Sequence, residues 1–224
     1  MGLHHSHSHG PAPADTPGGD KRLVFAIAVN VLLTVAQIIG GVLSGSLALV
    51  ADAIHNLSDA AALAIALIAR RIARHPADAK HTYGHGRAEM IAAVFNLAWL
   101  IFIGIFLVVE AVERFFNPQP IAGWTVVIIA AIALAVDIAT VMLTYRMSKT
   151  SMNIRAAFIH NLSDAMASVG VIVAGTLIIL YDWLFVDALV TIVIAAYILG
   201  HAAIEIPKAI HILMQGVPAG LDIA

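Results

Sequence analysis

The chain has 224 residues, of which 61% are hydrophobic and only 12% are charged, and its mean hydropathy is +0.93. Soluble domains average roughly 45–50% apolar and about 25% charged residues, so this composition excludes an ordinary soluble domain and indicates a polytopic membrane protein. The net charge of -2 gives no sign of a nucleic-acid-binding surface, because the few basic residues lie near segment ends. The chain has no cysteine, which excludes disulfides and thiolate metal ligands.

Residues 1–20 are rich in Gly, Pro and His and are predicted to be a disordered cytoplasmic tail, because they offer too little apolar surface to fold. No hydrophobic region of a signal peptide is evident in them, so the first apolar segment is expected to direct insertion. A purification tag is one interpretation of the histidines, but the interleaved serines favour a native metal-collecting tract. These histidines are His4, His5, His7 and His9.

Six apolar segments follow, and each is long enough to cross a hydrocarbon core about 30 Å thick at ~1.5 Å per helical residue. Turn residues separate them, such as Asn117-Pro118-Gln119-Pro120 between the third and the fourth. The sequence therefore predicts an all-α membrane protein with six transmembrane helices. The segments are Leu23–Leu43, Ser46–Ala73, Ala88–Phe116, Gly123–Arg146, Ser151–Leu180 and Trp183–Met214.

The basic residues predict the orientation of these segments. With six spans, every Lys and Arg except Arg114 falls on the same side of the membrane. Cytoplasmic loops carry the excess of basic residues in membrane proteins. Both termini are therefore predicted to be cytoplasmic.

The hexapeptide HNLSDA occurs twice, at residues 55–60 in the second segment and at residues 160–165 in the fifth. Each copy places a histidine and an aspartate four residues apart, on one face of a helix. Each histidine lies roughly 13–14 Å from the start of its segment, and the two segments enter the membrane from opposite sides. Both pairs are thus expected near the midplane, where they can meet. The pairs are His55 with Asp59 and His160 with Asp164.

A titratable side chain at bilayer depth indicates a functional site. One His-x-x-x-Asp pair could simply lock two helices together by a hydrogen bond, but two identical copies at matched depth favour a metal site. Two imidazoles and two carboxylates suit zinc, with cobalt, cadmium and iron(II) as alternatives, whereas magnesium, calcium and manganese favour more oxygen ligands. Such a site binds metal only when its imidazoles are neutral and its carboxylates ionised, which leads to the hypothesis of metal-for-proton exchange.

Three motifs, ADAIHNLSDA, HTYGHGR and the second HNLSDA, resemble the cation diffusion facilitator family, and specifically its zinc-transporting branch. The resemblance covers residues 21–220. It implies a six-helix fold, usually a homodimer, that exports a divalent metal ion from the cytoplasm in exchange for protons. It also implies that the ligands of the transport site are His55, Asp59, His160 and Asp164.

The loop between the second and third segments carries a second candidate metal site. Asp78, His81 and His85 supply one carboxylate and two imidazoles within eight residues, and the resemblance places a loop metal site of some family members at these positions. The alternative is a solvated loop whose histidines only shape the turn into the third helix.

Two further carboxyl groups lie within the apolar segments. Asp52 precedes His55 by three residues, on the same helix face, and is expected either to support the ligands or relay protons, or to cap the start of the helix. Asp137 lies alone in the middle of the fourth segment and is expected to face the bundle interior, on a proton or metal pathway.

Many family members continue beyond Gly216-Val217-Pro218-Ala219-Gly220 into a cytoplasmic domain, whereas this sequence stops at Ala224. The expected layout is therefore a tail over 1–20, a transmembrane domain over 21–215 and a short C-terminal tail over 216–224. The cytoplasmic domain is expected to be absent, naturally or by truncation.

These observations predict a secondary transporter that moves zinc, or a similar ion, out of the cytoplasm by proton antiport, in a bacterial inner membrane. The alternative is a membrane metal sensor or scaffold that binds metal without transporting it. No enzyme activity is expected. An intramembrane zinc hydrolase is disfavoured because four ligands would close the tetrahedron and no Glu lies beside them as a general base.

Overall fold

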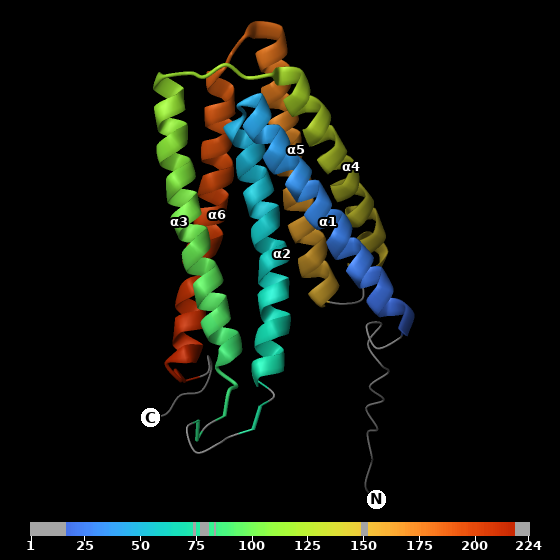
Figure 1. The fold of residues 1–224 in the computed structure, drawn as a ribbon, viewed down its shortest axis with the longest axis vertical. Coiled ribbons are helices and arrows are strands. Elements are labelled where there is room, and N and C mark those ends of the chain that lie inside the picture. Colours follow the sequence, from blue (N-terminus) through green and yellow to red (C-terminus); the bar gives the residue numbers. More distant parts are fainter. Residues whose placement is uncertain (1–16, 74, 77–80, 83, 149–151, 218–224) are drawn as a thin grey trace, which may run out of the picture.

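The computed structural model describes residues 17–73, 75–76, 81–82, 84–148 and 152–217. These residues form six helices and no strand, which confirms the all-α prediction. The helices run alternately up and down, so that α1 begins and α6 ends at the same end of the bundle (Figure 1). They are α1 (Pro17–Ser44), α2 (Leu47–Ala73), α3 (Ala88–Phe116), α4 (Gly123–Ser148), α5 (Met152–Tyr181) and α6 (Phe185–Leu213).

The helix bounds agree closely with the predicted segments, with one correction at α1. The bounds of α3 are as predicted, and those of α2, α4, α5 and α6 differ by one or two residues. Helix α1 begins at Pro17, so residues 17–20 are helical and the prediction that they belong to a disordered tail was wrong. Proline suits the first position of a helix, because its φ is preset and its missing N–H would have no partner there. The four histidines of the tail lie outside the described residues.

Four helices are long and apolar enough to cross a membrane over their described residues. These spans are Ala88–Phe116, Gly123–Met142, Phe158–Tyr181 and Phe185–Leu213, and the described apolar part of α1, Val31–Ser44, is shorter. Helix α2 is not among these four spans, and it buries four polar side chains close together, namely Asp52, His55, Asn56 and Ser58. A helix with a buried polar stripe needs neighbours that cover the stripe.

Helix α2 has such neighbours on several sides. It lies between the α3–α6 pair and the α4–α5 pair, and α1 packs against both α2 and α4 (Figure 1). Glycine allows the two pairs to pack closely: a Cβ at Gly104 of α3 would lie 2.7 Å from the Leu199 side chain of α6. A Cβ at Gly175 of α5 would lie 2.8 Å from the Val127 side chain of α4. The bundle therefore surrounds the polar stripe of α2.

The start of α2 is held in place by α6. Asp187, which is buried, accepts hydrogen bonds from the backbone N–H of Leu47 at 2.8 Å and of Ala48 at 3.3 Å, and from the Ser46 hydroxyl at 2.5 Å. Ser46 in turn accepts a bond from the N–H of Leu49 at 3.1 Å. The first N–H groups of a helix have no partner within the helix, so Asp187 satisfies groups that would otherwise be buried unpaired. These bonds fix the height of α2 relative to α6.

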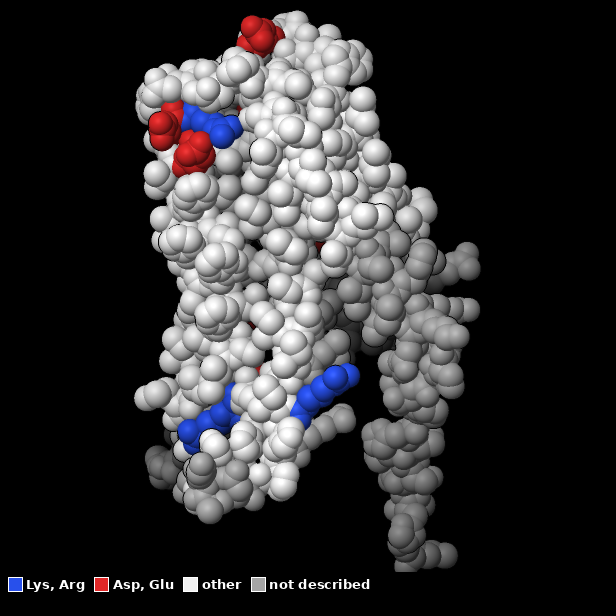
Figure 2. Space-filling model, in the orientation of Figure 1, with Lys and Arg blue, Asp and Glu red and all other residues white. Residues whose placement is uncertain are grey.

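The same end of the bundle holds Arg114 near the end of α3. Its guanidinium donates to Glu110 at 2.9 Å and to the carbonyl oxygen of Gly45, in the turn between α1 and α2, at 2.7 Å. Gly45 has φ +76°, and a Cβ there would lie 2.6 Å from the carbonyl oxygen of Pro120, so the turn requires glycine. Figure 2 shows a compact group of basic and acidic side chains at this end. Arg114, the exception to the predicted charge asymmetry, is therefore engaged in a structural contact.

Candidate metal centre

The structure brings the two copies of the hexapeptide together between α2 and α5. Each histidine lies within 4 Å of both aspartates. The His55 Nε2 atom is 3.8 Å from Asp59 Oδ2 and 3.5 Å from Asp164 Oδ1. The His160 Nε2 atom is 3.1 Å from Asp59 Oδ2 and 3.6 Å from Asp164 Oδ2. The predicted meeting of the two pairs is thus present in the structure.

The spacing of these atoms fits a tetrahedral ion. Zinc bound at about 2.0–2.1 Å by four ligands separates neighbouring ligand atoms by roughly 3.3 Å. The four measured His-to-Asp separations, from 3.1 to 3.8 Å, lie on both sides of that value. The four His-to-Asp separations are therefore compatible with one ion between the two helices.

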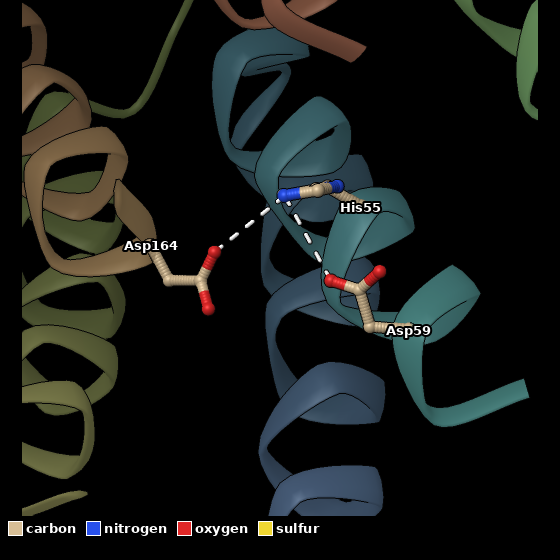
Figure 3. Close-up of side chains that lie close together, drawn as sticks. All are labelled: His55, Asp59 and Asp164. Carbon is tan, nitrogen blue, oxygen red and sulfur yellow. Dashed lines mark ion pairs between the residues drawn. The ribbon is translucent and has the colours of Figure 1, made fainter. Parts of the chain in front are cut away.

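One half of the group is buried and the other half is open. The side chains of His55 and Asp164 are 8% and 10% exposed, whereas those of Asp59 and His160 are 33% and 42% exposed. Figure 3 shows His55 and Asp59 on α2 facing Asp164, which comes from α5 across the gap. An ion would therefore reach the group from the side of Asp59 and His160.

Several buried atoms of the group have no hydrogen-bond partner among the described protein atoms. They are Nε2 of His55, Oδ2 of Asp59 and Oδ1 of Asp164. Buried polar atoms are nearly always paired in folded proteins, so three such atoms converging on one point indicate a ligand site. These three residues also offer ligand atoms that all lie within 4.8 Å of one another, a group that does not include His160.

A cavity of about 280 Å³ leads away from the group. His55, Asp59 and His160 line one end of it, and residues of α2, α3 and α6 line the rest, including Glu89, Asn96 and His201. Glu89 is in the first turn of α3, so the cavity runs toward the end of the bundle where α3 begins. Neither Glu89 nor His201 belongs to a motif that the sequence analysis could connect to the metal group. Membership of a common cavity is visible only in the fold.

The two additional carboxyl groups lie in polar contacts beside the group. Asp52 is buried in α2 and accepts a hydrogen bond of 2.8 Å from Gln37 of α1, which itself accepts from Asn56 at 3.4 Å. Asp52 is the sixth residue of α2, too far from the first turn to cap it, so the cap alternative is excluded. Asp137 of α4 is half-buried and accepts from Ser168 of α5 at 3.0 Å.

Part of the candidate loop site is described. The rings of His81 and His85 lie 4.4 Å apart, and the ring of His75 lies 5.9 Å from that of His85. Asp78 lies outside the described residues. His75 is not one of the predicted residues of the loop site, although its position three residues before Asp78 could have indicated a third imidazole there.

Comparison with known proteins gives a match over most of the chain. Residues 23–214 match the cation efflux transmembrane domain. The chain is 39% identical over 220 residues to the zinc transporter ZitB of Pectobacterium atrosepticum, which covers 98% of this chain and 67% of that protein. It is 38% identical over 221 residues to the zinc transporter ZitB of Escherichia coli, covering 98% and 71%.

A third relative is named for several metals. It is the cadmium, cobalt and zinc/H(+)-K(+) antiporter of Bacillus subtilis, 37% identical over 222 residues, with 98% of this chain and 69% of that protein covered. The chain thus spans about two thirds of the length of these bacterial relatives. The domain match and the identity, together with six helices that include four apolar spans, show a multi-pass membrane protein that belongs to the cation efflux family.

Proposed function

We propose that this chain exports divalent metal ions, zinc first among them, from the cytoplasm in exchange for protons. The observation that carries the proposal is the meeting of His55, Asp59, His160 and Asp164 at distances that suit one tetrahedral ion. The zinc, cadmium and cobalt in the names of the matched relatives support the same group of ions. Iron(II) suits the same ligand types.

Exchange for protons follows from the chemistry of the ligands. Imidazole binds metal through a neutral nitrogen and aspartate through an ionised oxygen, so metal and protons compete for the same four side chains. A metal ion that enters along the cavity displaces protons, and protons that arrive from the other side of the membrane release the metal. The Bacillus subtilis relative is named as an antiporter with H(+), which supports exchange of metal for protons.

The fold supplies a means of alternating access. The four ligands lie on α2 and α5, whereas α3 and α6 provide the opposite wall of the cavity. A rocking movement of the α3–α6 pair against the remaining helices would close the cavity on one side and open it on the other. We propose transport rather than hydrolysis, because the four ligands leave no open coordination position for an attacking water.

The neighbouring polar residues are assigned supporting roles in this proposal. Asp52, tied to α1 through Gln37, holds the ligand-bearing face of α2, and Asp137 lies beside α5 on the proton pathway. His81 and His85, with Asp78, gather metal ions at the cytoplasmic mouth. The tail histidines would do the same in solution.

The assembly is also a proposal. A homodimer in the inner membrane, with both termini cytoplasmic, is what the resemblance and the basic loops predict. Light scattering of the purified protein in detergent tests the dimer, and a monomeric mass would contradict it.

Zinc flux into proteoliposomes under an imposed proton gradient tests the transport function. The native protein should transport zinc, and Asp164→Ala should abolish transport. Ser163→Ala is the matched control, because Ser163 is adjacent to Asp164 but its hydroxyl donates to the backbone carbonyl of Ile159 at 3.1 Å. Zinc binding by the native protein without flux would contradict transport and favour the sensor or scaffold alternative.

A further inference from the structure

His55 is the most deeply buried histidine of the metal group, yet its ring has no hydrogen-bond partner among the described protein atoms. Both Nδ1 and Nε2 are unpaired. A metal-binding histidine usually donates its second ring N–H to a carboxylate or carbonyl, which fixes the orientation of the ring. In Figure 3 one ring nitrogen faces the two aspartates and the other points away from them. The Nδ1 side of the ring therefore lacks the hydrogen bond that usually orients a metal-binding histidine.

Two aromatic rings lie against the His55 ring. The ring of Tyr197, on α6, lies 5.7 Å from it with an interplanar angle of 87°, and the ring of His160 lies 6.0 Å away at 74°. Edge-to-face contacts of this kind favour one relative orientation of the two rings. His160 belongs to the metal group, so Tyr197 is the contact that comes from outside it.

Tyr197 and His55 also border a second cavity together. A second cavity of about 480 Å³ lies between α5 and α6 and is lined mainly by apolar side chains, among them Leu162, Met166 and Val193. His55 and Tyr197 line both this cavity and the polar one that leads to the metal group. The Tyr197 ring therefore lies beside the His55 ring where the two cavities meet.

We propose that Tyr197 is a positioning residue, whose ring holds the His55 imidazole with Nε2 directed at Asp59 and Asp164. The inference rests on the proposed metal-binding function. It assigns the role to the aromatic ring and not to the phenol oxygen, because the observed contact is between rings. It also makes α6 a contributor to the geometry of a site whose four ligands lie on α2 and α5.

Three variants of the full chain separate this role from general packing. Tyr197→Ala removes the ring, Tyr197→Phe keeps it, and Val193→Ala is the control. Val193 lies one turn before Tyr197 on α6 and lines the apolar cavity but not the polar one. Zinc affinity is measured by calorimetry on the detergent-purified protein, and the absorption spectrum of bound cobalt(II) reports whether the coordination is tetrahedral.

Tyr197→Ala should weaken zinc binding by about tenfold or more, the usual effect of losing a group that orients a ligand. It should also reduce the visible absorption intensity of tetrahedral cobalt(II). Tyr197→Phe should stay within about twofold of the native protein, and Val193→Ala should match it. If Tyr197→Ala unfolds, as judged by circular dichroism, Tyr197→Leu makes the same comparison with more volume retained.

Native zinc affinity and a native cobalt spectrum in folded Tyr197→Ala would overturn the inference while leaving the proposed function intact. An equal loss in Tyr197→Phe would overturn the role of the ring. Failure of the native protein to bind zinc, or native affinity in His55→Ala, would overturn the proposed function and this inference with it.

Discussion

The four residues of the metal group are chemically paired but not equivalent in position. His55 and Asp164 are buried and come from different helices, whereas Asp59 and His160 are partly exposed. A buried carboxylate has few alternative partners, so the group depends most on Asp164. An exposed ligand can be replaced in part by water.

Asp164→Asn keeps the shape of the side chain but removes its negative charge. Zinc affinity should fall by more than about 100-fold, because the loss of a direct ligand exceeds the 10–100-fold effect of outer partners. Asp182→Asn is the control: Asp182 lies in the turn before α6 with φ +55°, a conformation that asparagine also adopts. Calorimetric titration with zinc measures both, and equal affinities would show that Asp164 is not a ligand.

Zinc binding should weaken as the pH falls, because protons compete for the imidazoles. Each imidazole that must lose a proton to bind the metal contributes up to about tenfold in apparent affinity per pH unit. In His160→Asn one imidazole remains, so the apparent affinity should fall less steeply with decreasing pH than in the native protein. Titrations at several pH values, with a buffer that does not bind zinc, make the measurement. An affinity independent of pH would contradict proton exchange at these residues.

At the scale of the element, the helices follow from apolar runs that end at turn residues, and this is why α3 matched its predicted bounds. The duplicated hexapeptide likewise predicted which side chains meet, since antiparallel helices bring residues of equal depth together. Residues whose role depends on a distant partner gave no such signal. Asp187 caps a helix that starts 140 residues earlier, and Tyr197 is one aromatic residue within an apolar run.

Loss of the Asp187 side chain should destabilise the start of α2. Asp187→Ala leaves the N–H groups of Leu47 and Ala48 buried without that acceptor and should cost about 1–3 kcal/mol. Asp187→Asn keeps one acceptor oxygen and should lie between the alanine variant and the native protein. Thermal unfolding in detergent followed by circular dichroism gives the order, with the exposed Glu113→Gln as the control. Identical midpoints for all of these variants would contradict the capping role.

At the scale of the whole molecule, the metal group is connected to one end of the bundle by the polar cavity. The polar side chains that line this cavity away from the metal group include Glu89, at the start of α3, and His201, on α6. An ion that enters along the cavity passes these side chains before it reaches the ligands. Their chemistry, an imidazole and a carboxylate, favours transient binding of a divalent cation.

The double variant Glu89→Gln and His201→Gln should raise the KM for zinc transport several-fold while leaving kcat near the native value. Weaker capture on the way in acts on binding and not on the later conformational step. Glu205→Gln is a suitable control, because Glu205 is one turn beyond His201 on α6 and pairs with Lys208 at 2.6 Å. Initial rates of zinc uptake over a range of zinc concentrations separate the two parameters. An unchanged KM would show that zinc does not enter along this cavity.

The bonds at the opposite end of the bundle determine how such a molecule can move. Asp187 joins the start of α6 to the start of α2, and Arg114 joins the end of α3 to the turn before α2. In this conformation the moving pair is bonded to α2 at one end, so this end acts as a pivot, and opening it to the other side of the membrane requires these bonds to break. Helix α6 has 29 residues and is about 43 Å long, so a rotation of about 5° around the pivot displaces its far end by roughly 4 Å. A rotation of a few degrees at this end therefore opens a gap wide enough for a metal ion at the opposite end of the bundle.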